Sequence, residues 1–173
     1  MTPFILALAA AQAAPATPPP APASTQSPDE RYRACAALAR TEPQRAVETA
    51  TAWQRAGGAF LARQCLGLAY VELQMWALAA TAFEEAARDA GQVQDSRRAD
   101  LLAQAGNAWL AVDEAGNALR AFDSALEVGQ LTDPMRGEIH LDRARARMAL
   151  DEAAAARADI DQALHLVPLD PFA

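Results

Sequence analysis

The sequence predicts an all-α fold built from repeated helix pairs, and three observations support that prediction. From Asp29 onward the 173-residue chain is rich in Ala, Leu, Arg, Glu and Asp, a mixture typical of long helices. Val, Ile and Thr are scarce and alternating apolar–polar runs are almost absent, which argues against strands. A spacing of small and aromatic residues also recurs along the chain. The length suits one domain of ordinary size with a short extra segment.

Residues 1–13 have the features of a signal peptide. Residues 4–11, FILALAAA, form an apolar run that is too short to span a bilayer, which needs roughly 20 apolar residues. Ala11-Gln12-Ala13 supplies a small–x–small pattern, so we expect cleavage after Ala13 or Ala14 and a periplasmic or secreted protein. No Arg or Lys precedes the run, and the alternative is an Ala-rich start of a cytoplasmic protein. No Cys directly follows the run, so we expect no lipid anchor. We also expect no membrane insertion after signal removal.

Residues 14–28 are dense in Pro and Ala, which disfavours helix and predicts a semi-extended linker. A Pro-rich recognition ligand is the alternative, but no basic residue flanks the prolines. The remaining residues, 29–173, form the predicted folded domain.

The body of the chain repeats one set of spacings. Gly67 and Tyr70 stand three apart, and Ala79, Phe83 and Ala86 follow at intervals of nine, four and three. The same intervals recur, with weaker residues in the first and fourth copies, as Gly106, Trp109, Ala118, Phe122 and Ala125; as Ala144, Arg147, Ala156, Ile160 and Ala163; and as Ala34, Ala37, Ala46, Ala50 and Trp53. The copies begin 33, 39 and 38 residues apart, which indicates a repeat protein.

Packing explains these residue types. A Gly or Ala in the first helix of a pair lets the second helix approach closely, and an aromatic residue one turn later fills the space beside it. Phe83 and Phe122 are expected to reach into the cleft between neighbouring pairs. Each pair leaves one apolar face open, which only the next pair can cover.

The pattern resembles the tetratricopeptide repeat family over roughly residues 28 to 170. The resemblance implies a helical solenoid of about four helix–turn–helix pairs. The expected helices cover 29–40, 44–55, 58–73, 76–90, 95–112, 115–128, 134–150 and 152–166. Pro28 and Pro134 suit first turns and Asp133 suits an N-cap, while Gly57-Gly58, Gly91 and Gly129 suit helix stops. The links around Gly91 and Gly129 are longer than the family's usual ones.

The same resemblance bears on the two cysteines. Cys35 and Cys65 fall in the first helices of the first two pairs, which lie side by side in this architecture. In an oxidising compartment an even number of cysteines favours a disulfide, and the alternative is two buried thiols.

In this family the first helices line a concave groove that holds a peptide. The residues that the register places there are Arg31, Cys35 and Leu38; Gln64, Leu68 and Val71; Asp100, Ala103, Asn107 and Leu110; and Glu138, Leu141, Arg145 and Met148. Clamping of a chaperone's C-terminal carboxylate is not expected, because only Arg31, Asn107 and Arg145 suit that role. The alternative for each groove residue is a solvated helix face.

Charge and composition argue against several other functions. The net charge is −7 and every basic residue is Arg, so binding to nucleic acid is not expected. The two histidines, His140 and His165, belong to no metal-ligand spacing, no phosphate-binding Gly-rich loop is present, and no Ser has a His partner for catalysis. We therefore expect no cofactor, no metal and no enzymatic activity.

Protein binding remains as the predicted function, in the form of a periplasmic adaptor or scaffold with a polypeptide partner. A self-associating structural subunit and a non-catalytic accessory domain stay open as alternatives. The C-terminal end is a second candidate surface: Ile160, Ala163, Leu164, Val167 and Phe172 form an apolar strip. Arg143 and Arg147, which replace apolar or aromatic residues of earlier copies, are expected to face water there.

Overall fold

The structure is a computed structural model that describes residues 26–129 and 131–167. These residues form helices and no strand. The helices are α1 (Pro28–Thr41), α2 (Pro43–Arg55), α3 (Ala59–Glu72), α4 (Trp76–Gln92), α5 (Arg98–Leu110), α6 (Ala115–Leu126), α7 (Asp133–Ala149) and α8 (Ala153–Leu166). Each expected helix is present, with ends that differ by three residues or fewer. The predicted signal peptide, most of the linker and Phe172 lie outside the described residues.

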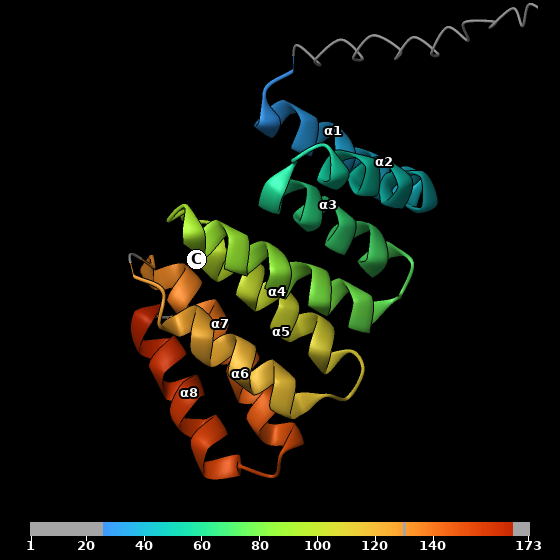
Figure 1. Ribbon diagram of the computed structural model, residues 1–173. Coiled ribbons are helices and arrows are strands. Elements are labelled where there is room, and N and C mark those ends of the chain that lie inside the picture. The colour runs from blue at the N-terminus through green and yellow to red at the C-terminus, as the bar shows by residue number, and fades with distance from the viewer. Residues whose placement is uncertain (1–25, 130, 168–173) are drawn as a thin grey trace, which may run out of the picture.

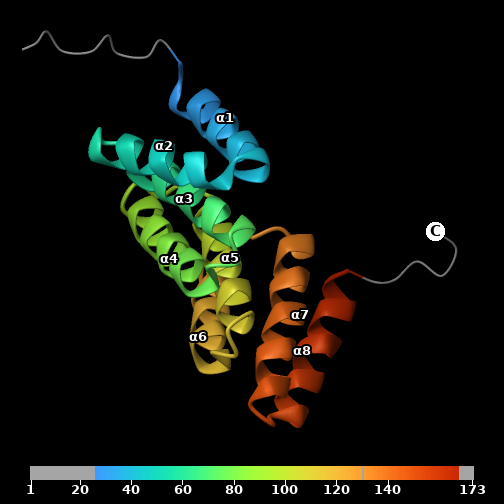
Figure 2. The same ribbon diagram turned by 90° about the vertical axis from the view of Figure 1, so that its right-hand side faces the viewer.

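The helices pack in chain order as four antiparallel pairs (Figure 1). Each helix contacts the next one, and first helices of neighbouring pairs also touch, α1 with α3 and α5 with α7. Figure 2, turned by 90°, shows the α7–α8 pair standing beside the pairs that precede it. The fold is therefore a helical solenoid of the tetratricopeptide-like type, as the repeat spacing predicted.

Three of the four hairpin turns have one backbone design. Gln74, Asp113 and Asp151 occupy equivalent positions and all adopt left-handed backbone angles, with φ of 57°, 60° and 61°. In each turn the next amide donates to the carbonyl five residues back, for example from Glu114 N to Trp109 O at 3.0 Å. Such a turn ends one helix and starts the next in a fixed direction. The repetition shows that the second, third and fourth pairs are copies of one unit.

The first pair departs from that unit. Its connection has no left-handed residue, and α1 runs on to Thr41 before Pro43 starts α2. Cys35, Ala36 and Ala39 are buried there, whereas Ala34 and Ala37 are exposed. The predicted first-helix anchors Ala34 and Ala37 are therefore wrong, because the different turn changes which face of α1 meets α2.

Helix ends correct two further expectations. Thr132, not Asp133, caps α7, and its hydroxyl accepts from Met135 N at 3.4 Å. Gly91 lies inside α4, which ends one residue later, and the left-handed residue of that link is Gln94. At α1 the expectation holds: Pro28 is in the first turn, and Ser27 and Glu30 form a capping box.

Glycine positions in α3 and α5 fix how closely the helices of a pair approach. A Cβ built on Gly67 would lie 2.6 Å from the Phe83 ring, and one built on Gly106 would lie 2.5 Å from the Phe122 ring. Each Phe is buried against the glycine of its own pair. The prediction that glycine permits close approach is confirmed. The expectation that Phe83 and Phe122 reach into the cleft between pairs is corrected, because each ring lies against the glycine of its own pair.

Gly67→Leu should destabilise the fold by about 1–3 kcal/mol or more, because the new side chain overlaps the buried Phe83 ring. Thermal and urea unfolding followed by circular dichroism measure the effect. Gly116 is the matched control, because no atom lies within 4 Å of a Cβ built there. Gly116→Ala should be neutral or stabilise by up to about 1 kcal/mol. Equal melting of Gly67→Leu and the parent would show that this helix packing is wrong.

None of the helices in the described ranges is long and apolar enough to cross a membrane.

Candidate interaction surface

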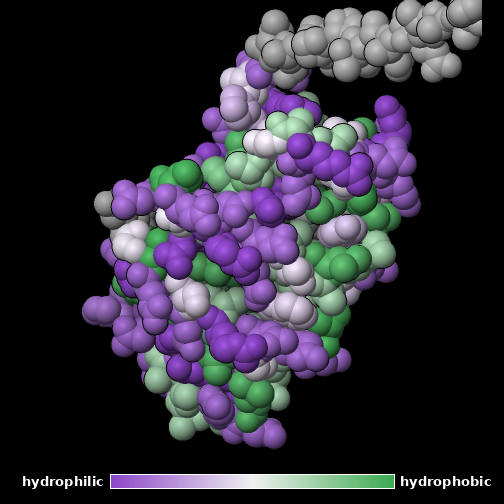
Figure 3. Space-filling model, viewed as in Figure 1, coloured by the Kyte–Doolittle hydropathy of each residue, from purple (hydrophilic) through white to green (hydrophobic). Residues whose placement is uncertain are grey.

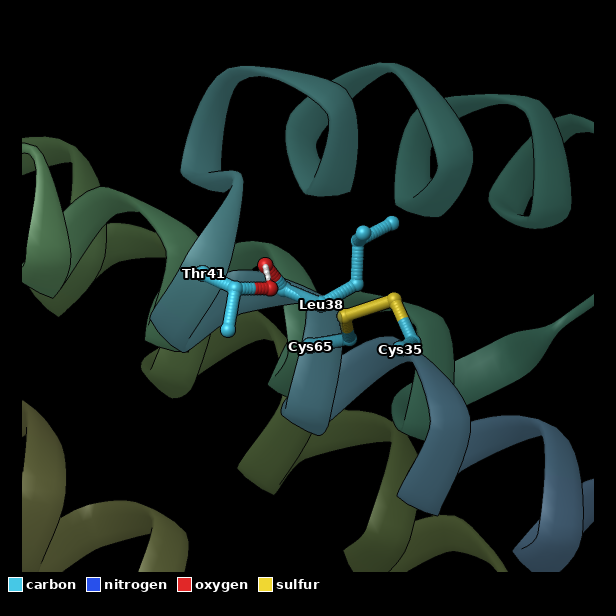
Figure 4. Close-up of a disulfide and its surroundings, with 4 residues drawn as sticks. All are labelled: Cys35, Leu38, Thr41 and Cys65. Atoms are coloured by element: carbon cyan, nitrogen blue, oxygen red, sulfur yellow. Dashed lines mark hydrogen bonds between the residues drawn. A yellow bond between two sulfur atoms is a disulfide. The ribbon is translucent and has the colours of Figure 1, made fainter.

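A disulfide joins the first two pairs. Cys35 of α1 and Cys65 of α3 are bonded, with their Cα atoms 6.0 Å apart, and both residues are buried. Figure 4 shows the bond between the two helices, beside Leu38. The Cα separation is in the normal range for a disulfide. The predicted pairing of Cys35 with Cys65 is confirmed.

A charged contact also ties the first pair to the third. Arg97, just before α5, donates to Asp29 of α1 at 2.8 Å and to Asp95 at 2.8 Å. Its guanidinium lies over the Phe60 ring, 4.8 Å from the centroid. Hydrogen bonds from Arg97 lower the pKa of Asp95, so the carboxylate stays charged. Together with the disulfide, this contact holds the atypical first pair in place.

Three predicted groove residues do not face an open groove, and one of them, Cys35, is buried in the disulfide. Arg31 lies over the Trp53 ring, 4.8 Å from its centroid, and so packs toward α2. Gln64 is only 4 % exposed, and its Oε1 has no hydrogen-bond partner among the described residues. The first three pairs also supply five apolar groove residues, which are half-buried and pack against the core: Leu38, Leu68, Val71, Ala103 and Leu110.

The exposed part of the predicted groove lies on α7. Glu138, Leu141, Arg145 and Met148 are all exposed, and their spacing of three and four residues places them on one helix face. We call these four residues the α7 inner face. Leu141 and Met148 are large apolar side chains in contact with solvent, 46 % and 56 % exposed. This face offers apolar contacts with one charged side chain of each sign.

Polar contacts connect this face to α5. Asn107 Nδ2 donates to Asp142 Oδ2 at 2.7 Å, and Arg145 pairs with Asp142 on its own helix. The predicted groove residues Asn107 and Arg145 are thus brought together through Asp142, which sequence reasoning did not single out. The link fixes α5 and α7 side by side at the base of the groove.

The groove between α5 and α7 is acidic. The pKa of Asp100 is raised above its ordinary value, chiefly by burial and also by the negative charge of Glu138. The hydrogen bond from Gln104 opposes this shift. Asp142 adds a third carboxylate on the same side. The surface therefore favours neutral or cationic groups over anionic ones.

The fourth pair holds a buried carboxylate that sequence analysis missed. Asp159 of α8 is 1 % exposed and accepts from Arg143 at 2.6 Å and from Arg147 at 2.7 Å. His140 Nδ1 lies 2.8 Å from the same carboxylate. Burial alone would raise the pKa of Asp159, but the hydrogen bonds from Arg143 and His140 outweigh it and lower the pKa. The expectation that Arg143 and Arg147 face water is wrong, because both bind Asp159.

A signal for this cluster was present in the register. The equivalents of Asp159 in the second and third pairs are Ala82 and Ala121, both buried. A carboxylate at a position that is otherwise a buried alanine requires partners inside the fold. Arg143 and Arg147 supply them.

One acidic position joins successive pairs. Glu84 follows Phe83 and accepts from Trp109 Nε1 of the next pair at 2.8 Å. Asp123 follows Phe122 and accepts from Arg143 Nη1 of the next pair, also at 2.8 Å. The second helices of the second and third pairs, α4 and α6, thus each present a carboxylate to the helix that follows.

The outer end of the α7–α8 pair carries an apolar hollow of about 190 Å³, which we call the end groove. Its lining consists of Pro134, Gly137, Glu138, Leu141, Ala163, Leu164 and Val167. Ile160, which belongs to the apolar strip expected at this end, is 37 % exposed beside it on α8. Figure 3 shows mostly hydrophilic residues on the viewed face; the hydrophobic surface at its lower end lies over the turn between α7 and α8, at the opposite end of the pair from the end groove.

A larger hollow of about 920 Å³ lies at the links before α5 and α7. The long links that the sequence singled out, around Gly91 and Gly129, line it. Most of its charged side chains already have partners, because Asp95 binds Arg97 and Asp100 binds Gln104. Nor do the described residues bring three His, Cys, Asp or Glu side chains together as a metal would need.

Comparison with known proteins supports the fold. No family model matches the chain, and no curated protein matches its sequence. Among solved structures, MamA MSR-1 C2, which contains tetratricopeptide repeats, aligns with 83 % of this chain and 79 % of its own length. The TM-score is 0.61 at 19 % sequence identity. The chain is similar to that protein in its arrangement of helices.

Proposed function

We propose that the protein is an exported, non-catalytic scaffold that binds a partner polypeptide along the α7 inner face. The observation that carries this proposal is the exposure of Leu141 and Met148 on one face of a rigid helix, with Arg145 between them. Apolar side chains presented in a row on a helix, with charges between them, suit a peptide or helix partner. The similarity in fold to MamA supports the scaffold on which this face is built.

The chemistry of the groove constrains the partner. Asp100, Glu138 and Asp142 make its wall acidic, and Asp142 engages Arg145 and Asn107. A bound segment therefore presents apolar side chains to Leu141 and Met148 and a neutral or basic group to the carboxylates. An acidic segment would meet repulsion.

Capture from the envelope fraction tests this function. Partners recovered with the parent protein should be lost with a double variant, Arg145→Glu and Met148→Glu. The first change replaces an exposed cation by an anion, and the second replaces an exposed apolar side chain by a charged one. Leu78→Glu on α4 is the matched control, since Leu78 is a similarly exposed large apolar residue away from α7. Quantitative mass spectrometry compares the three captures. Equal recovery with the double variant, at unchanged stability, would remove the α7 inner face from the proposal.

Export is proposed from the apolar run at residues 4–11 and the Ala-Gln-Ala pattern that follows it. The buried Cys35–Cys65 disulfide fits an oxidising compartment. The protein purified from its native source should begin near Ala14 or Pro15, which intact mass spectrometry measures. A soluble cytoplasmic chain that retains Met1 would contradict export.

A further inference from the structure

The end groove has two counterparts inside the same molecule, and both are covered. The counterpart of Leu164 in the third pair is Leu126, which packs in the same core cluster as Ile139 and Met135 of α7. The counterpart in the second pair is Ala87, which is fully buried in that cluster. Leu164 itself is 45 % exposed, and no helix among the described residues lies over it. At both covered positions, the covering element is a helix.

The carboxylate that joins successive pairs is also available at this end. Asp161 stands in the register of Glu84 and Asp123, each of which accepts a hydrogen bond from the following helix. Its only ion pair in the described chain is with Arg157, one turn away on α8, at 3.0 Å. Both of those side chains are exposed, so that pair contributes little to stability.

We propose that the end groove binds an amphipathic α-helix of a partner protein, seated as α7 is seated on the third pair. Its apolar stripe fills the hollow between Leu141, Leu164 and Val167. An Arg on that helix donates to Asp161, as Arg143 donates to Asp123. This surface extends the proposed scaffold function to a second site, which shares Glu138 and Leu141 with the α7 inner face but does not include Arg145 or Met148.

The first described helix of a second copy of this chain does not supply such a stripe. The helix at the other end of the solenoid is α1, and its outward residues at spacings of four, four and three are Asp29, Arg33, Ala37 and Arg40, all exposed. That face has no large apolar side chain to enter the groove. Asp29 already pairs with Arg97, and burial of the guanidinium groups of Arg33 and Arg40 against the apolar Leu164 and Val167 is unfavourable.

A synthetic helix tests the proposal directly. The probe is a stapled helix of about 15 residues that carries Ile and, four residues later, Arg, spaced as Ile139 and Arg143 are in α7. Its affinity is measured by fluorescence anisotropy against the parent, Leu164→Glu and the control Leu78→Glu. Leu78 is 46 % exposed, which matches Leu164. Leu164→Glu should weaken binding at least about tenfold, a change of 1.4 kcal/mol, and Leu78→Glu should not.

A charge exchange tests the polar contact. Asp161→Arg should weaken binding of the Arg probe, and a probe with Glu in place of Arg should regain affinity for that variant alone. Met148→Glu should leave probe binding unchanged, so failure of the α7 inner face and failure of the end groove are distinguishable.

Three results would overturn the proposal. The first is equal affinity of the probe for Leu164→Glu, with melting unchanged. The second is a parent that sediments as a dimer which Leu164→Glu dissociates, because a second copy would then fill the groove. The third is a gain of about tenfold in probe affinity on removal of residues 168–173, because those residues would then be its occupant.

Discussion

Replacement of Asp159 by Asn is expected to lower the free energy of unfolding by about 3–5 kcal/mol. Asp159 is buried and accepts from Arg143, Arg147 and His140, so loss of its charge leaves Arg147 without a counter-ion and leaves Arg143 with Asp123 alone. Urea unfolding at neutral pH, followed by circular dichroism, measures the change. Asp161→Asn is the matched control on the same helix: its carboxylate is exposed, and we expect a change within about 0.5 kcal/mol.

The effect of Asp159→Asn should depend on pH. Because the folded pKa of Asp159 is lowered, its contribution is fully present above the unfolded pKa of about 3.9 and is lost as the pH falls through the folded value. The difference between parent and variant should therefore be largest near neutral pH and shrink below about pH 4. Two results would contradict a carboxylate held ionised by Arg143 and Arg147. One is a difference in unfolding free energy that stays constant down to acid pH, and the other is an Asp159→Asn protein as stable as the parent.

Removal of the disulfide should have the second-largest effect. Cys35→Ser with Cys65→Ser opens a loop with a sequence separation of 30, and the chain-entropy model gives a loss of about 3–4 kcal/mol. The first pair should be affected most. Its turn lacks the left-handed residue of the other pairs, and the small Ala50 packs where the other pairs have the ring of Phe83 or Phe122. Denaturant unfolding of the double variant and of the parent, without reductant, measures the difference.

Thiol labelling provides the complementary test. The native protein, denatured without reductant, should contain no reactive cysteine, because both sulfur atoms are in the bond. Two labelled thiols would contradict the disulfide in the native protein. In that case the double variant should lose only what two small buried side chains contribute.

The sequence was sufficient for the helix pairs and their main contacts. Gly67 and Gly106 were identified from spacing alone as points of close helix approach, but Phe83 and Phe122 were assigned to the cleft between pairs and lie instead against the glycine of their own pair. A disulfide between Cys35 and Cys65 was predicted because neighbouring first helices lie side by side in the tetratricopeptide repeat family, which the sequence resembles. These features depend on local spacing and on one repeated unit, which a sequence displays directly.

The features that sequence analysis missed lie where the chain departs from the repeated helix pair. The face of α1 follows from a turn without a left-handed residue, so Ala34 and Ala37 were placed wrongly. Arg143 and Arg147 were assigned to solvent because a charge usually lies at the surface, and the buried partner Asp159 was not considered. Gln64 occupies a groove position in the register, yet neighbouring helices bury it.

Site-specific photo-crosslinking in the native cell tests most directly whether this solenoid binds a protein partner. A photo-reactive residue in place of Met148, on the α7 inner face, should give one discrete crosslinked product with a second polypeptide. The same residue in place of Leu78, which is also exposed but lies on α4, should give none. Crosslinking of equal yield at both positions, or at neither, would contradict the account of this protein as a scaffold that binds its partner along α7.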